Sequence, residues 1–189
     1  MLRMRSSECV LLIIDVQDKI VNTVADRANV LHGLKALISA SRILNIPIII
    51  TEQQKMGELA SEISLPDNEV VRLKKITFSC CDVSEFRNKL QTLGRKSVLV
   101  CGVETHICVM QTVLDLLAMK YEVLILRDLT SSHGIADRET AIERMRQAGA
   151  VISTTEAVIF ELMGDAAGTE FKRILQIIKD FRSGDDITL

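Results

Sequence analysis

Residues 97–108, SVLVCGVETHIC, join an apolar run rich in β-branched residues to a helical pattern through a single glycine. Ser97 to Gly102 predicts a buried strand, and His106 to Met119 repeats apolar residues at helical spacing. Strand and helix units that alternate in this way are typical of a parallel sheet covered by helices on both faces. The segment therefore indicates an α/β fold.

The same alternation extends over the whole chain. Six apolar runs predict the strands of one sheet: Cys9 to Asp15, Pro47 to Thr51, Val70 to Leu73, Ser97 to Gly102, Glu122 to Arg127 and Ala150 to Ser153. Helical periodicity predicts the helices Arg27 to Leu44, Val83 to Leu93, His106 to Met119, Arg138 to Ala148, Thr155 to Leu162 and Thr169 to Phe181. We therefore predict a single-domain three-layer α/β/α fold over residues 1–189, with a six-stranded parallel, Rossmann-like sheet. The irregular segment from Glu52 to Asn68 predicts a mobile loop.

Composition excludes several classes of protein. The 189 residues are 48% hydrophobic and 25% charged, which suits one compact core. A net charge of −2 and an aromatic content of 3% provide neither the positive charge nor the stacking residues typical of nucleic-acid-binding proteins. The apolar runs are too short to cross a bilayer. No signal-peptide pattern opens the chain, and the five cysteines lack metal-type spacing. We therefore expect reduced thiols and a cytoplasmic protein that binds neither nucleic acid nor membranes.

Asp15 follows a buried apolar run, so its carboxylate is expected at the carboxyl edge of the sheet. In a doubly wound sheet the first and fourth strands are neighbours, and ligands bind outside their carboxyl ends. This topology places Asp15 beside the turn after Gly102. An aspartate that precedes a helix, here one starting near Gln17 or Asp18, also commonly serves as a helix cap.

Cys108 falls in the first turn of the helix after Gly102, with Thr105 as the predicted N-cap. Unpaired amides and the positive end of a helix dipole lower the pKa of a cysteine in this position. The alternative is a small core residue, which is the usual environment of a free cysteine. We interpret the other four cysteines as core residues: Cys9, Cys80, Cys81 and Cys101.

A third candidate lies in the segment KKITFS, residues 74–79, directly after the third predicted strand. Lysines in a loop are generally solvated. Composition does not choose between Lys74 and Lys75.

Taken together, these segments resemble the isochorismatase-like cysteine hydrolases. The resemblance rests on LIIDVQ at residues 12–17, KITFS at residues 75–79 and GVETHICV at residues 102–109, in that order. It extends over YEVLILRDLTSS at residues 121–132 and RMRQAGA at residues 144–150, and so covers most of the chain. The resemblance implies a hydrolase with the isochorismatase-like hydrolase fold.

The resemblance also implies a catalytic set of Asp15, Lys75 and Cys108. Lys75 is chosen because it precedes the phenylalanine of the family's Lys-x-x-Phe-Ser pattern by three residues, which Lys74 does not. In the implied mechanism Asp15 accepts the thiol proton, Lys75 keeps the carboxylate ionised, and Cys108 attacks a carbonyl carbon to form a thioester.

Further site residues follow from the same resemblance. It implies a cis peptide bond between Val103 and Glu104, in the turn before the nucleophile. The oxyanion is expected to be held by the backbone at Val103, Glu104 and Cys108. Substrate contacts are expected from Gln17, Gln53 and Phe78.

Nicotinamidases of this family bind a metal through an aspartate and histidines after the second strand, but Glu52 to Leu59 contains no histidine. The three histidines of the chain are dispersed: His32, His106 and His133. We therefore expect no metal and no cofactor, and a small-molecule substrate other than nicotinamide. Because members of the family commonly form dimers or larger closed assemblies, we also expect a homo-oligomer.

Two alternatives remain open at this point. Isochorismate hydrolysis splits a vinyl ether by protonation and needs no thiol nucleophile, so Cys108 favours an amide substrate. Some relatives are non-catalytic or bear a ribonuclease label. The acidic balance and scarce aromatic residues disfavour RNA, although a local basic patch is available at Arg72, Lys74 and Lys75.

Overall fold

The computed structural model describes residues 3–63, 65–66, 68–187 and 189. Its centre is a six-stranded sheet in the order β3-β2-β1-β4-β5-β6, in which all neighbouring strands are parallel. The strands are β1 (Cys9–Ile14), β2 (Ile48–Gln53), β3 (Val71–Lys75), β4 (Ser97–Val103), β5 (Glu122–Ser131) and β6 (Val151–Ser153). The predicted single-domain α/β/α fold with six parallel strands is confirmed.

Seven α-helices connect or follow the strands in the described part of the chain. They are α1 (Asp18–Val21), α2 (Arg27–Ile43), α3 (Ser84–Leu93), α4 (Met110–Ala118), α5 (Ile135–Gln147), α6 (Thr155–Met163) and α7 (Phe171–Ser183). Three short helical turns are η1 (Ser6–Glu8), η2 (Cys80–Asp82) and η3 (Thr105–Val109). None of the described helices combines the length and apolarity needed to span a bilayer.

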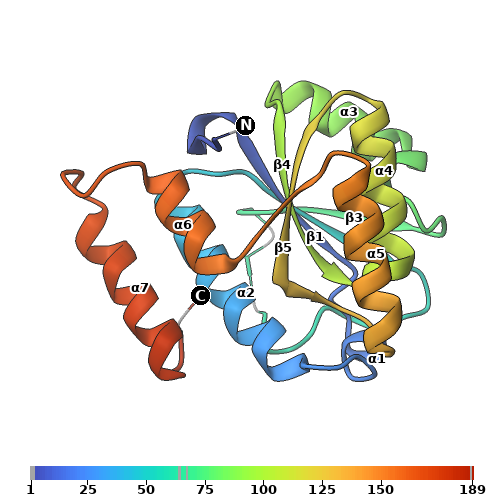
Figure 1. Cartoon of the computed structure of the whole chain (residues 1–189), viewed down its shortest axis with the longest axis horizontal. Coiled ribbons are helices and arrows are strands. Elements are labelled where there is room, and N and C mark those ends of the chain that lie inside the picture. Colours follow the sequence, from blue (N-terminus) through green and yellow to red (C-terminus); the bar gives the residue numbers. More distant parts are fainter. Residues whose placement is uncertain (1–2, 64, 67, 188) are drawn as a thin grey trace.

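Helices cover both faces of the sheet, with α2, α6 and α7 on one side and α3, α4 and α5 on the other (Figure 1). All six residues of β1 are buried. Leu11 and Ile13 belong to the core beneath the first set of helices, and Leu12 and Ile14 to the core beneath the second. Because successive side chains of a strand point to opposite faces, a central strand covered on both sides is apolar throughout.

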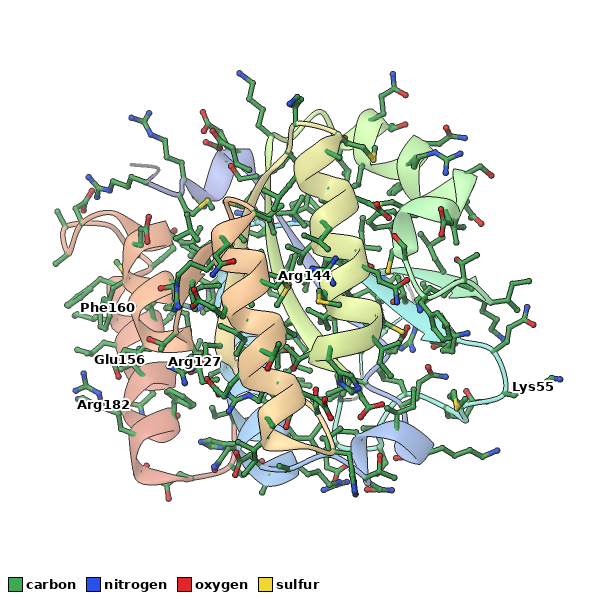
Figure 2. The ribbon with its side chains drawn as sticks, turned by 45° about the vertical axis from the view of Figure 1, so that its right-hand side comes forward. Lys55, Arg127, Arg144, Glu156, Phe160 and Arg182 are labelled. Carbon is green, nitrogen blue, oxygen red and sulfur yellow. The ribbon has the colours of Figure 1, made fainter. Side chains whose placement is uncertain are left out.

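The two C-terminal helices are joined at the surface as well as through the core. Figure 2 shows Glu156 of α6 and Arg182 of α7 side by side, and the two form an ion pair. An exposed pair of this kind contributes little stability. The apolar contacts of Ile174 and Ile178 beneath α7 therefore hold this helix in place.

Strands β2 and β3 extend into polar residues that the sequence pattern did not assign to them. β2 continues past Thr51 to Gln53, and β3 continues past Leu73 to Lys75. The added residues are polar, so the apolar pattern used for the prediction stops before the strands do. The backbone pairing between β2 and β3 continues as far as Gln53 and Lys75. Lys75 is therefore a strand residue and not a loop residue.

Other predicted boundaries also needed correction. β1 ends at Ile14 and excludes Asp15, whereas β5 runs on to Ser131. Helix α5 begins at Ile135, three residues before the predicted start at Arg138. The prediction missed the first turn because its residues show little helical periodicity.

The predicted helix from His106 to Met119 is divided into two elements. η3 is a π-helix of five residues, and the regular helix α4 begins at Met110. Thr105 is inside η3, so it is not the N-cap, and its hydroxyl lies 2.9 Å from the hydroxyl of Thr130. Glu104 precedes η3 without a capping side-chain hydrogen bond. Single π-turns of this kind occur frequently at functional sites.

The segment from 54 to 70 has neither helix nor strand among its described residues, apart from an isolated bridge between Gln17 and Leu59. Residues 64 and 67 of the predicted loop lie outside the described part of the chain. Glu52 and Gln53, which we assigned to the loop, belong to β2.

Gly102 brings the carboxyl ends of β1 and β4 into close contact. It pairs with Ile14 and has a φ of +120°, a conformation that strains any residue with a side chain. A Cβ atom at this position would lie 2.1 Å from the carbonyl oxygen of Ile14. The glycine is therefore required where the chain turns from β4 into η3.

We predict that Gly102→Ala lowers the free energy of unfolding by about 3 kcal/mol or more, because backbone atoms have to move. Gly94→Ala is the matched control, since Gly94 also has positive φ, at 62°, but a Cβ added there would lie more than 4 Å from the atoms of other described residues. It should cost about 1 kcal/mol. Urea unfolding of both variants measures the difference, and equal losses would contradict the contact argument.

Candidate active site

The structure brings Asp15, Lys75 and Cys108 together at the carboxyl edge of the sheet. Asp15 follows β1, Lys75 ends β3, and Cys108 lies in η3 after β4. All three are buried, with exposed fractions of 0%, 2% and 6%. The expected convergence at the point where the winding reverses is thus observed.

Lys75 and Asp15 form a buried ion pair, with 2.6 Å between Nζ and Oδ2. The ammonium also donates to Oε1 of Gln53 at 2.7 Å and to the carbonyl oxygens of Thr77 and Phe78 at 3.2 Å each. Burial lowers the pKa of Lys75, but attraction to Asp15 and to Cys108 outweighs it, so the net pKa is raised above the usual range. Lys75 is therefore a cation at neutral pH.

The two oxygens of the Asp15 carboxylate have different partners. The Thr51 hydroxyl donates to Oδ1 at 2.9 Å. Oδ2 lies 2.6 Å from the Lys75 ammonium, and within the described residues it has no further hydrogen-bond donor. Because each carboxylate oxygen can accept two hydrogen bonds, Oδ2 retains the capacity to receive a proton from a neighbouring group.

Cys108 interacts with both charged partners. Burial and the Asp15 carboxylate raise the pKa of its thiol to about 12, against the lowering effect of Lys75. The sequence predicted a lowered pKa from the start of a helix, and this prediction was wrong in direction. The desolvation of the sulfur and the adjacent negative charge dominate, so the thiol is protonated at neutral pH.

The backbone at Val103, Glu104 and Cys108 lies in the turn between β4 and α4. The peptide bond between Val103 and Glu104 is cis. Oε1 of Glu104 accepts a hydrogen bond from the amide of His133 at 3.1 Å, which ties the turn to the chain after β5. The turn is thereby held on the same edge as the thiol.

Two of the three expected substrate contacts have structural partners instead. The Gln17 side chain is buried and donates to the carbonyl oxygens of Gln53 and Gly57 at 3.1 and 2.7 Å, while its own oxygen accepts from the amide of Gln53 at 2.7 Å. Gln53 uses its side chain on Lys75 and on the carbonyl oxygen of Ile76. Phe78 is 54% exposed and available for contact.

Gln17 and Gln53 nevertheless line a polar pocket, although Asp15, Lys75 and Cys108 are not among its lining residues. Its volume is about 440 Å³, and charged side chains of both signs surround it. The other lining residues are Glu52, Gln54, Lys55, Gly57, Glu58 and Lys74. Figure 2 shows Lys55 extending outward from this loop. The two glutamines thus shape the pocket while they hold the loop and Lys75.

Sequence reasoning missed Thr51. Cys80 is a buried core residue, as predicted, and its sulfur also lies 3.7 Å from the Thr51 hydroxyl. Burial raises the pKa of Cys80 to about 11, while Lys75 lowers it. The one signal for Thr51 was register, because a parallel neighbour of β1 places it opposite Ile14.

The histidines are engaged elsewhere. His106 Nδ1 lies 2.9 Å from the Ser132 hydroxyl, and His133 Nδ1 lies 2.9 Å from the carbonyl oxygen of Thr23. Among the residues the structure describes, no three or more side chains of His, Cys, Asp or Glu are grouped so as to hold a metal ion.

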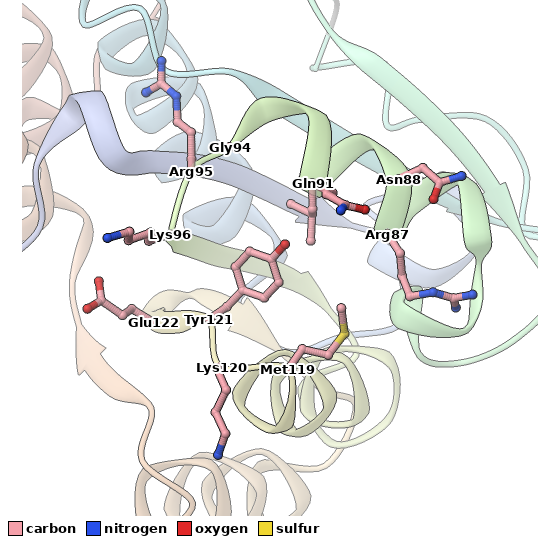
Figure 3. Close-up of a pocket in the computed structure, with 11 residues that line it drawn as sticks. Arg87, Asn88, Gln91, Gly94, Arg95, Lys96, Met119, Lys120, Tyr121 and Glu122 are labelled. Carbon is pink, nitrogen blue, oxygen red and sulfur yellow. The ribbon is translucent and has the colours of Figure 1, made fainter.

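A second concave region lies at the opposite edge of the sheet (Figure 3). It has a volume of about 600 Å³, and its lining includes Tyr121 and four basic side chains: Arg87, Arg95, Lys96 and Lys120. Arg87, near the start of α3, donates to the carbonyl oxygen of Cys81, and Arg95 donates to the carbonyl oxygens of Ser6 and Cys9. Two of the four basic side chains therefore have backbone partners.

Comparison with known proteins places the chain in a family. The isochorismatase domain matches residues 9–157. The secreted isochorismatase effector Isc1 of Phytophthora sojae is 42% identical over 178 residues, which are 90% of this chain and 84% of the relative. A structure described as the MAR1 ribonuclease of Caenorhabditis elegans is 30% identical, covers 100% of this chain and 97% of its own, and gives a TM-score of 0.87.

A more distant structure shares the fold. The YcaC gene product of Escherichia coli, described as an octameric hydrolase of unknown specificity, is 23% identical and gives a TM-score of 0.85. It covers 97% of this chain and 94% of its own. The Rossmann-like sheet and the matches define an α/β protein of the isochorismatase-like hydrolase type. The chain belongs to the isochorismatase family.

We predict that Asp15→Asn moves the ionisation midpoint of Cys108 from about 12 towards neutral by about one pH unit or more. The variant removes the charge that raises the pKa and retains Lys75, which lowers it. The ultraviolet absorbance of the thiolate, corrected by subtraction of a Cys108→Ala background, measures the midpoint. Asp18→Asn, in the nearby helix α1, should leave it in place. An unchanged midpoint in Asp15→Asn would show that the carboxylate does not act on the thiol.

We predict that Lys75→Met lowers the free energy of unfolding by about 3–5 kcal/mol at neutral pH, because it leaves a buried carboxylate without its partner. Lys74→Met changes the adjacent residue of the same strand, which is exposed, and should cost less than about 0.5 kcal/mol. Adding Asp15→Asn to Lys75→Met should recover part of the loss. Urea unfolding compares the three variants, and similar losses for both lysines would rule out a stabilising pair.

Proposed function

We propose that this isochorismatase-family hydrolase cleaves the C–N bond of a small amide through a thioester on Cys108. The observation that carries the proposal is the buried contact of one thiol with both members of the Lys75–Asp15 ion pair. A protonated thiol is a weak nucleophile, and an adjacent carboxylate with an available oxygen is the base that activates it.

The chemistry follows from these contacts. The proton of Cys108 passes to Oδ2 of Asp15 as the sulfur forms a bond to the carbonyl carbon, and the carbonyl electron pair moves to oxygen. The backbone at Val103, Glu104 and Cys108 stabilises this oxyanion. Its collapse breaks the C–N bond, and Asp15 protonates the departing amine. Water then attacks the thioester, with Asp15 as base, and the thiol is regenerated.

Lys75 keeps the site electrically balanced through both steps. Its ammonium stays within 2.6 Å of the carboxylate and interacts with the sulfur. As Cys108 gains thiolate character, Asp15 becomes neutral. The ammonium of Lys75 is then attracted mainly to the sulfur instead of the carboxylate oxygen. The proton transfer therefore occurs without leaving an uncompensated buried charge.

The surroundings support a small substrate. Gln17 and Gln53 line a pocket of about 440 Å³, within the size range of small-molecule sites, and a hydrogen bond from Lys75 to Gln53 connects this pocket to the ion pair. Phe78, on the chain after β3, adds an exposed apolar surface. No metal or cofactor takes part in the proposed steps, because the acid, base and nucleophile are all side chains of this chain.

Assembly and location belong to the same proposal. Three large apolar side chains on the chain after β3 and at the start of α5 are more than half exposed: Ile76, Phe78 and Ile135. Exposed apolar surface of this kind supports a homo-oligomer, and a fold neighbour is described as octameric. All five cysteines are free, which suits a reducing compartment such as the cytoplasm.

We predict that Cys108→Ala lowers ammonia release from a panel of small carboxamides by about 1,000-fold or more, because no other group supplies the nucleophile. Cys9→Ala is the matched control, since this buried cysteine lies at the opposite end of β1.

The same Cys108→Ala variant also tests the two alternative activities, vinyl-ether hydrolysis and RNA cleavage. Hydrolysis of a vinyl ether such as isochorismate that survives Cys108→Ala would replace the amide mechanism with ether protonation. RNA cleavage by the wild type that survives the same substitution, in the absence of amide hydrolysis, would favour the activity named for the Caenorhabditis elegans relative.

A further inference from the structure

The geometry points to Thr51 as a positioning residue for the Asp15 carboxylate, with the thiol of Cys80 fixing the direction of the Thr51 hydroxyl. None of these contacts involves a reacting atom directly. The catalytic consequence rests on the proposed function, whereas the positioning itself is a property of the fold.

Thr51 holds Asp15 from two sides. Its hydroxyl donates to Oδ1 at 2.9 Å, and its carbonyl oxygen accepts from the backbone amide of Asp15 at 3.1 Å. Thr51 and Asp15 are buried, with exposed fractions of 1% and 0%. Because water has little access to either group, the threonine supplies contacts that solvent would otherwise supply.

Asp15 needs such support because its backbone conformation is unfavourable. It has a φ of +52°, a region that residues with side chains seldom adopt. It also lies beyond the last residue of β1, so the regular pairing of the strand does not continue through it. The two contacts with Thr51 fix the residue where the strand no longer does.

The direction of each hydrogen bond follows from the chemistry of the groups. An ionised carboxylate only accepts, so the single hydroxyl proton of Thr51 has to point to Asp15. The sulfur of Cys80 lies 3.7 Å from the same hydroxyl oxygen. That oxygen has used its proton and can only accept, so Cys80 is the donor. The raised pKa of Cys80, about 11, keeps the required proton on the sulfur.

The two oxygens of the carboxylate consequently have different partners. Thr51 holds Oδ1, and Lys75 lies 2.6 Å from Oδ2. Without the hydroxyl, the ion pair alone fixes the rotation of the carboxylate about its terminal bond, which has a broad torsional preference. Thr51 thus fixes the orientation in which the carboxylate meets the Cys108 proton.

The titratable groups that interact with the carboxylate come from three elements packed around it: Lys75 of β3, Cys80 of η2 and Cys108 of η3. Lys75 holds the carboxylate through charge, whereas the hydroxyl of Thr51 holds it through a directional hydrogen bond. Loss of that hydroxyl should therefore change the orientation of the carboxylate while the ion pair remains.

The kinetic test compares Thr51→Val, which keeps the shape and removes the hydroxyl, with Thr51→Ser, which restores it. We expect Thr51→Val to lower kcat/KM for the amide substrate by about 10–100-fold, mainly through kcat and with KM little changed. Thr51→Ser should return kcat towards wild type. The matched control is Thr155→Val, a buried threonine of α6 whose hydroxyl has no hydrogen bond within the described residues.

The Cys80 contact is tested by a double-variant cycle. Cys80→Ala alone should lower kcat/KM in the same direction but by less than Thr51→Val. If the thiol acts through Thr51, adding Cys80→Ala to Thr51→Val should cause no further loss. Additive losses would show that Cys80 does not act through the hydroxyl.

A crystallographic test is independent of any substrate. The crystal structure of Thr51→Val should show the Asp15 carboxylate rotated away from its present orientation, while that of Thr51→Ser should retain it. An unmoved carboxylate in Thr51→Val, or wild-type kcat and kcat/KM in that variant, would overturn the inference. Absence of thiol-dependent hydrolysis in the wild type would instead refute the proposed function, and the crystal structures alone would then decide the positioning role.

Discussion

The ion pair between Lys75 and Asp15 is the constraint on which the arrangement of the site depends. Removing two opposite charges from water costs several kcal/mol for each charge. Their mutual attraction offsets that cost only when their remaining hydrogen-bond donors and acceptors also have partners. Lys75 accordingly reaches Gln53 and two backbone carbonyl oxygens, and Asp15 receives the hydroxyl of Thr51. The residues around the pair are explained by this requirement.

The topology of the sheet explains where those partners come from. In the order β3-β2-β1-β4, the strand that ends in Lys75 is separated from the strand that precedes Asp15 by β2. The lysine side chain therefore crosses the carboxyl end of β2, which carries Thr51 and Gln53. The intervening strand supplies one partner to each member of the ion pair. The close approach of β4 at Gly102 then brings Cys108 to the other side of Asp15.

The resting state of the thiol follows from the same balance. Because Lys75 and Asp15 have opposite effects on Cys108, burial is the largest influence on its pKa, and the net result is a protonated sulfur. A protonated thiol avoids a second buried negative charge beside the carboxylate. Activation is thereby coupled to substrate, since the proton needs to move only when the sulfur forms a new bond.

The sequence by itself determined the fold class, the six parallel strands and the segments that carry Asp15, Lys75 and Cys108, because hydrophobic periodicity and turn residues are local properties of the chain. The choice of Lys75 over Lys74 came from family resemblance, and the structure buries the former and exposes the latter. Only the tertiary structure decided the direction of the Cys108 pKa and the partners of the ion pair. Desolvation and hydrogen bonding depend on groups that meet across neighbouring strands, and no pattern along one strand specifies them.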